Sequence, residues 1–225
     1  MKAQKYNIAI FDTFKTRNNK FTGEAKRQRG IIAHLATEQS PQLRTRTSIA
    51  HVIAERHGIL WQNIYSGIFR DLDEVLIPSG VVKEGGRLPL HRGPNALQME
   101  GVPFYELTNT GLLVASSIEE LGLSRTKVLE SYIRSIPIGA PNYEVMREGI
   151  LLLNKFAPSF ACKIVKEYVR ACTVGLIEDI TPMDIRKLRS VISARIGIEK
   201  ELIESFDRLQ TDQKEAIRRF INLIS

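Results

Sequence analysis

Apolar residues recur at helical spacing through most of this chain, and Pro, Gly and Thr residues interrupt them at short intervals. An apolar face repeated every three or four residues is typical of an amphipathic helix, and Pro or Gly marks where such a helix starts or stops. From residue 124 onward no stretch is convincingly strand-like. The second half is therefore predicted to be all-helical, with helices at about 124–136, 142–156, 159–178, 182–196 and 198–223, the last broken near Thr211.

The first half has helical patterns followed by two strand-like segments. The predicted helices cover about 25–38, 47–58, 61–76 and 110–121. Thr47 and Thr108 precede the second and fourth of these helices, where a threonine side chain can accept a backbone N–H as an N-cap. Val81–Val82 and 102–107 are strand-like, and a Gly- and Pro-rich loop over 84–101 connects them. The expected fold class is mainly α with a small two-stranded β unit.

Positive charge is concentrated at the start of the chain. The net charge is +7, and residues 1–50 contain ten Lys or Arg against three acids, whereas residues 51–225 contain 22 of each sign. A basic segment beside a folded domain is the electrostatic pattern expected of a phosphate-backbone contact. A solubilising tail is the alternative. We expect a basic arm over 1–24, a first domain over 25–122 and a helical domain over 123–225.

The order helix, helix, helix, strand, loop, strand, helix over 25–121 resembles the winged helix-turn-helix family of archaeal and bacterial regulators. The string Phe104-Tyr105-Glu106-Leu107-Thr108-Asn109-Thr110-Gly111 is similar to the ending by which such domains leave the wing and enter the next helix. The segments 29–35, 47–50, 61–76 and 80–82 also carry the resemblance, which covers just under half of the chain. It implies a module that binds double-stranded DNA, with the third helix as the recognition helix.

The third predicted helix can present polar side chains opposite its apolar face. If Trp61, Ile64 and Ile68 are buried, the exposed stripe contains residues that can read base edges in the major groove: Gln62, Asn63, Ser66 and Arg70. Gly67 lies on the same face and costs the helix about 1 kcal/mol relative to alanine, which the close approach of a ligand backbone would rationalise.

Other residues are candidates for contacts with the DNA backbone. Around the first two helices these are Lys26, Arg27, Arg29, Arg44, Arg46 and Thr47, and in the wing they are Arg87, His91 and Arg92. The acids Asp71, Asp73 and Glu74 at the end of the third helix would repel phosphate, so only its first two turns are expected to enter the groove. That acidic end leaves open a protein-interaction adaptor as the alternative, and a replication or partition factor would use the same DNA contacts.

Several classes of protein are not supported by the sequence. No phosphate-binding glycine loop, nucleophile elbow or zinc-binding motif is present, so we expect neither an enzyme nor a cofactor or metal site. Cys162 and Cys172 are expected to be two buried thiols in one helix. No apolar run approaches the roughly 20 residues of a membrane span, and the polar start lacks a secretory signal, so a cytoplasmic protein is expected. The helical half is expected to form a homodimer, to bind a partner or to enclose an effector.

Overall fold

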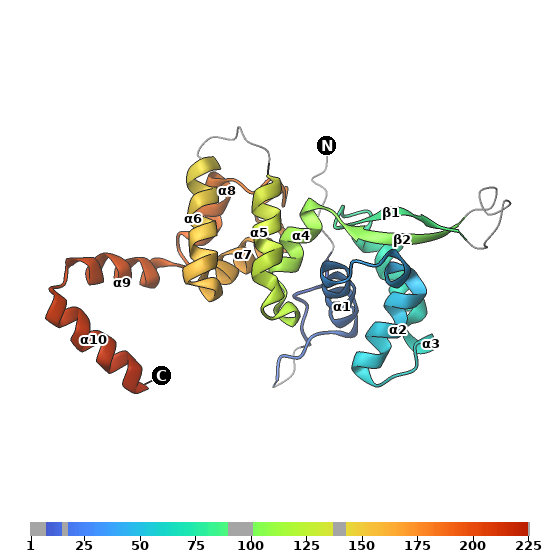
Figure 1. Ribbon diagram of the computed structural model, residues 1–225, viewed down its shortest axis with the longest axis horizontal. Helices are drawn as coiled ribbons and strands as arrows, with labels where there is room; N and C mark the ends of the chain where they lie inside the picture. The colour runs from blue at the N-terminus through green and yellow to red at the C-terminus, as the bar shows by residue number, and fades with distance from the viewer. Residues whose placement is uncertain (1–7, 15–17, 90–100, 137–142, 225) are drawn as a thin grey trace.

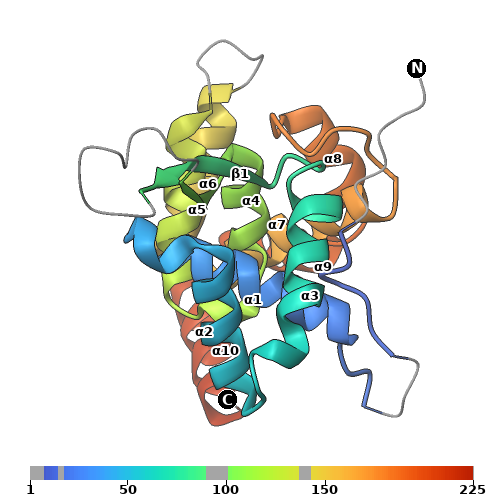
Figure 2. The same cartoon turned by 90° about the vertical axis from the view of Figure 1, so that its right-hand side faces the viewer.

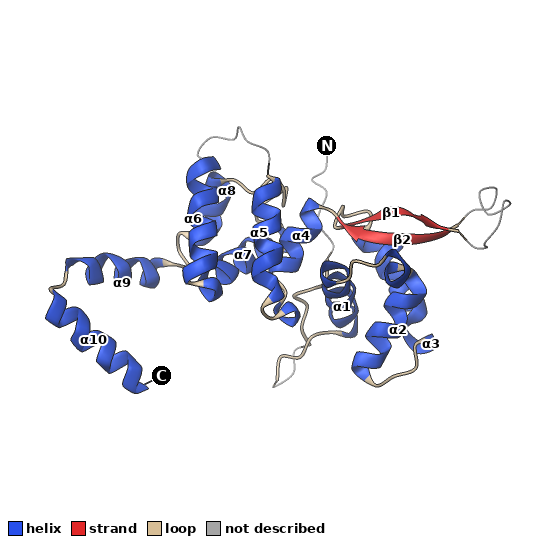
Figure 3. Cartoon of the chain, viewed as in Figure 1, coloured by secondary structure: helices blue, strands red, loops and turns tan. Residues whose placement is uncertain are grey.

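The computed structural model of the protein describes residues 8–14, 18–89, 101–136 and 143–224. Over these ranges the chain is mainly α-helical, with ten α-helices and one two-stranded antiparallel sheet (Figure 3). The expected fold class is confirmed. The molecule is elongated, with the sheet near one end and the last two helices at the other (Figure 1).

Three helices precede the sheet: α1 (Gly23–Thr37), α2 (Arg46–His57) and α3 (Gln62–Arg70). After Arg70 the chain continues without interruption into a π-helical segment, Asp71–Leu76, so the predicted helix over 61–76 is present with a change of pitch in its second half. In the turned view, α1 lies behind α2 and α3 (Figure 2), and it contacts both of them. The N-terminal helices therefore form a bundle around α1.

The N-cap of α2 differs from the prediction. A short 3-10 turn, Pro41–Arg44, leaves Thr45 in an extended conformation, and its side-chain oxygen accepts the backbone N–H of Ser48 at 3.3 Å. The prediction of Thr47 as the cap was wrong, because the helix has already begun at Arg46 and Thr47 lies exposed in its first turn. The predicted end of the helix is confirmed, since Gly58 adopts the left-handed conformation that closes α2.

The sheet is a hairpin of β1 (Val82–Leu88) and β2 (Val102–Leu107). The prediction of a loop from residue 84 was wrong, because β1 extends to Leu88 through an irregularity between Glu84 and Gly86. The ring of Phe104 on β2 covers the glycines there, and a Cβ at Gly86 would lie 2.9 Å from it. Two glycines, which suggest a loop in sequence, instead make room for a neighbouring aromatic ring in a bulged strand.

The cap that follows the hairpin agrees with the prediction. The Thr108 side chain accepts the backbone N–H of Gly111 at 3.1 Å and starts α4 (Asn109–Ser116). A Cβ on Gly111 would lie 2.1 Å from the carbonyl oxygen of Val81, so only glycine fits this close approach of helix and strand. The helix ends earlier than predicted, and a 3-10 turn, Glu119–Leu121, follows it.

The second half is helical, as predicted. The helices are α5 (Ser124–Ser135), α6 (Tyr143–Phe156), α7 (Pro158–Thr173), α8 (Ile185–Ile192), α9 (Gly197–Arg208) and α10 (Thr211–Ile224). The predicted break before Thr211 is present. Helices α4 to α8 pack on one another, whereas α9 and α10 extend away from them (Figure 1). Cys162 and Cys172 are both free and buried on α7, as expected.

One hydrophobic core runs from Ile8 to Met183 and crosses the expected boundary at residue 122 without a gap. Its first members, Ile8 and Ile10, come from the segment 1–24, which was expected to be a basic arm. Gln28, which is fully buried, accepts the backbone N–H of Ala9 through its side-chain oxygen at 2.8 Å. These residues are held in the core because their apolar side chains and their backbone groups both find partners on α1.

Candidate nucleic-acid interface

Helix α3 has one buried face and one exposed polar face. Ile68 is fully buried, and Trp61 and Ile64 are partly buried against the core. The Trp61 ring also contacts the rings of His51 and Tyr65, with distances between ring centroids of 4.6 Å and 5.5 Å. On the opposite face the four predicted base-reading residues are all exposed: Gln62, Asn63, Ser66 and Arg70. These four side chains are therefore accessible on the face of α3 opposite Ile68.

Arg27 crosses the exposed face of α3 to reach an acid at its end. The Nε atom of Arg27 donates to Asp71, which has no exposed side-chain surface, at 2.7 Å. A Cβ on Gly67 would lie 2.7 Å from the same Nε atom. Glycine is needed at this position because the Arg27 side chain passes directly over it. The guanidinium of Arg27 thus fills the space that the sequence analysis expected a ligand backbone to occupy. Arg27 nevertheless lines one groove with Asn63, Ser66 and Arg70.

A second arginine neutralises the next acid of the same segment. Arg46 forms an ion pair with Asp73. Its guanidinium also lies over the Phe69 ring, 4.0 Å from the centroid, and over the Tyr105 ring. The acidic end of the third helix was expected to repel phosphate, but Asp71 and Asp73 both carry arginine partners. The repulsion expected of them is therefore largely offset, while neither arginine is a free phosphate anchor.

Arg29 is the most buried of the predicted anchors, with 2% of its side chain exposed. It forms an ion pair with Glu120 and donates through Nη1 to the carbonyl oxygen of Ile10 at 3.0 Å. Its guanidinium lies 4.1 Å from the centroid of the Phe21 ring. This side chain connects α1 to the N-terminal segment and to the turn after α4, so it cannot reach a phosphate without leaving the interior.

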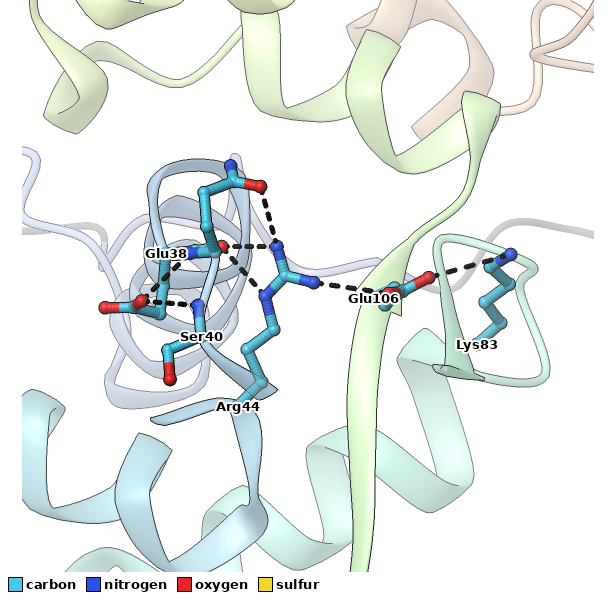
Figure 4. Close-up of polar contacts among 6 residues, drawn as sticks. Glu38, Ser40, Arg44, Lys83 and Glu106 are labelled. Atoms are coloured by element: carbon cyan, nitrogen blue, oxygen red, sulfur yellow. Dashed lines mark hydrogen bonds and ion pairs between the residues drawn. The ribbon is translucent and has the colours of Figure 1, made fainter. Parts of the chain in front are cut away.

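Arg44 lies in a polar network between the first helices and the hairpin (Figure 4). Its Nε atom donates to the carbonyl oxygen of Glu38 at 2.8 Å, and Nη1 lies 3.3 Å from the carboxylate of Glu106, which also pairs with Lys83. The Glu38 carboxylate accepts the backbone N–H of Ser40 at 2.8 Å, and this hydrogen bond lowers the pKa of Glu38 below its usual value. The network fixes the chain that leads into α2.

The remaining predicted contacts have different surroundings. Lys26 and Thr47 are exposed. Arg87 on β1 donates to the carboxylate of Glu84 at 2.7 Å. His91 and Arg92 lie outside the described residues. The structure therefore brings Lys26 and the α3 residues to accessible positions, while Arg27, Arg29, Arg44 and Arg46 are engaged with acids of the same chain.

Sequence reasoning missed two exposed apolar residues in the turn that leads into α3. Ile59 and Leu60, in the turn between α2 and α3, are 44% and 69% exposed. The helical spacing used to find buried residues does not apply to a turn, so their exposure could not be read from the pattern. Two large apolar residues directly after the glycine that closes α2 were the only available signal.

Among the described residues, no group of three or more His, Cys, Asp or Glu is arranged to hold a metal ion. Burial raises the pKa of Cys172 to about 12, which keeps this thiol protonated and unreactive near neutral pH. No helix in the described part of the chain is long and apolar enough to cross a bilayer. Comparisons with protein-family models, curated proteins and solved structures found no match to the chain.

Proposed function

We propose that residues 23–121 form a winged helix-turn-helix module that binds double-stranded DNA through α3, and that the protein is a transcription regulator. The observation that carries the proposal is the polar face of α3, on which Gln62, Asn63, Ser66 and Arg70 are exposed while Ile68 is buried. Amide and guanidinium groups on an exposed helix can form paired hydrogen bonds with base edges in the major groove. The hairpin β1–β2 would then be the wing.

The charges around α3 support this surface over its alternatives. Lys26 and Arg70 are exposed, and Arg27 lines the same groove as Asn63 and Ser66 although Asp71 holds it. A phosphate at this groove can therefore meet the positive charge of Arg27 and Arg70 beside the polar side chains. The ion pairs of Asp71 and Asp73 reduce the repulsion that these two acids would otherwise exert on an approaching DNA strand.

The test is fluorescence-anisotropy binding of duplex DNA over a salt series, with Lys26→Ala and Arg70→Ala in place of variants at the buried arginines. If Lys26 contacts a phosphate, its loss weakens binding and makes the slope of log affinity against log salt shallower by about one. Arg70→Ala, at a residue proposed to read base edges, is expected to weaken binding as well. Lys127→Ala is the matched control, because Lys127 is an exposed cation on α5 away from this surface. Wild-type protein that shows no salt-sensitive binding at low salt would contradict the proposal.

Base reading by the same helix is tested separately. After selection of a preferred duplex from a random pool, Gln62→Ala and Asn63→Ala are expected to reduce the preference over random DNA by about 1–3 kcal/mol for each lost base contact. Selection that yields no enriched sequence, combined with salt-sensitive binding, would indicate a DNA-binding protein without sequence preference. A replication or partition factor with that behaviour would then be the better assignment.

A second candidate function is a protein-interaction adaptor, favoured by the exposure of Ile59 and Leu60 beside α3. Exposed apolar side chains are common in the centre of protein interfaces, whereas DNA presents mainly charge and hydrogen-bonding groups. Leu60→Ser separates the two functions. It is expected to leave salt-sensitive DNA binding unchanged if the polar face binds DNA. If the surface serves a protein partner, the wild-type protein already shows no such DNA binding.

A further inference from the structure

Helices α9 and α10 form an unpartnered pair at the end of the molecule opposite the hairpin (Figure 1). In the described part of the chain, no side chain between residues 197 and 222 is buried. The start of α9 is connected to α7 by an ion pair between Glu199 and Lys163. The two helices therefore extend from the core without contributing to it.

Each of these helices carries an apolar stripe. On α9 the stripe is formed by Ile198, Leu202 and Phe206, at successive spacings of four, and on α10 by Ile217, Phe220 and Ile221. Ile198 is 81% exposed and Phe220 is 60% exposed. Such stripes are amphipathic helix faces without a partner in the monomer, and leaving them in water is costly.

The end of α9 and the start of α10 contact each other at the joint between the two helices. Lys214 and Arg218, from the first two turns of α10, lie over the Phe206 ring at 5.8 and 5.6 Å, and the Lys214 amine donates to the carbonyl oxygen of Asp207 at 3.3 Å. Only Leu209 and Gln210 connect the helices. Away from this joint the two helices diverge (Figure 1), so most of both stripes is accessible to a second molecule.

The helices differ in charge. Helix α9 carries four acids and two bases, whereas α10 carries three bases and two acids. Pairing α9 with the α9 of another copy, or α10 with another α10, would bring like charges together. Pairing α9 of one copy with α10 of the other brings the acidic helix onto the basic one. A two-fold axis generates this contact twice, because each copy supplies both helices.

We infer that α9 and α10 form a two-fold homodimer interface in which α9 of each copy packs against α10 of the other. The helices have similar lengths, 12 and 14 residues, so their stripes can cover one another along most of their extent. The four helices would form an antiparallel bundle with the apolar stripes inside and the opposite charges at its edges. The inference does not depend on DNA binding and is tested without DNA.

The first experiment measures the mass of the full-length protein by sedimentation and light scattering over the micromolar range. The chain has a mass of 25.5 kDa, so the expected particle has twice that mass. The double variant Leu202→Asp with Phe220→Asp is expected to be a monomer. Its helices α1–α8 should unfold at the same temperature as in the wild type, because neither replaced side chain is buried. Val145→Asp with Leu152→Asp on α6, also exposed in the monomer, is the matched control and is expected to remain dimeric.

The second experiment tests which helices pair. Glu201→Lys with Glu204→Lys reverses the charge of α9, and Arg219→Glu reverses that of α10 while it leaves Arg218 over the Phe206 ring. Each reversal alone is expected to raise the dimer dissociation constant at least tenfold, and the two reversals together in one chain are expected to restore it. Far-UV circular dichroism checks that each variant keeps its helices.

Three outcomes would overturn the inference. Wild-type protein that is monomeric throughout the range would show that α9 and α10 close on each other or serve another partner. A dimer that survives Leu202→Asp with Phe220→Asp would place the interface elsewhere. Single charge reversals without effect would show that like helices pair, which contradicts the assignment of α9 to α10.

Discussion

At the scale of single residues, the arginines near the start of the chain contribute mainly to the fold. Arg27, Arg29, Arg44 and Arg46 each reach an acid that lies between 27 and 91 positions away in the sequence. Sequence reasoning counted these arginines as free positive charge, since their partners are not near them in the chain. Removing them would therefore change stability, which is why the test of the proposed DNA binding uses Lys26 and Arg70.

The Arg27–Asp71 pair gives the first prediction. Arg27→Ala leaves the fully buried Asp71 carboxylate without its partner, and we expect the free energy of unfolding to fall by about 2 kcal/mol. This value is below the range for fully buried pairs because 21% of the Arg27 side chain is exposed. Urea unfolding provides the measurement. Lys26→Ala, at the exposed neighbouring position, is the control and should change stability by less than about 0.5 kcal/mol.

A second prediction concerns high pH. Burial raises the pKa of Cys172 from 9.0 to about 12, so between these values the thiol ionises in the unfolded chain but not in the folded one. The unfolded state then binds fewer protons, and stability falls as pH rises above 9. Cys172→Ala should make this fall shallower by about 1.4 kcal/mol per pH unit. Equal pH dependence in both proteins, measured by urea unfolding, would contradict the assignment.

At the scale of elements, helix starts were harder to predict than helix existence. Thr47 was the expected cap of α2, but the hydrogen-bond pattern shows that the cap is Thr45. The choice depends on the 3-10 turn Pro41–Arg44, which sets where the chain becomes extended. The same applies to β1, whose glycines are explained by the side chains of Phe104 and Glu106 on the neighbouring strand.

The cap of α2 gives a third prediction. Thr45→Ala removes the acceptor of the Ser48 backbone N–H and should destabilise the protein by about 1 kcal/mol. Thr47→Ala makes the same chemical change two residues later, at an exposed position in the first turn, and should be within about 0.5 kcal/mol of wild type. Thermal and urea unfolding of the two variants, measured under the same conditions, show which threonine caps α2.

At the scale of the whole molecule, the core joins the two halves that sequence reasoning separated at residue 122. Helix α4 packs against α1 on one side and against α5 and α7 on the other. Leu113 and Val114 on this helix are fully buried. Because one helix contributes to both packing regions, we expect the N-terminal bundle and helices α5–α8 to unfold together.

This cooperativity is the fourth prediction. Trp61 fluorescence reports on the N-terminal bundle, and far-UV circular dichroism reports on all helices. The urea transitions measured by the two probes should coincide, as they do for a single cooperative unit. A fragment of residues 1–122 should be unstable, since it exposes the α4 side chains that pack on α5 and α7. Two separated transitions would instead support two independent domains.

The sequence by itself determined the fold class, the number and approximate places of most helices, the hairpin, the cap at Thr108 and the exposed face of α3. These follow from local periodicity and from Pro, Gly and Thr at helix ends, because such residues determine the conformation of only the few residues around them. Only the tertiary structure decided that four arginines are engaged with acids, that Gly67 gives Arg27 its path, that Ile8 and Ile10 join the core and that α9 and α10 leave it. Those outcomes depend on which distant segments come into contact, and neither periodicity nor composition carries that information.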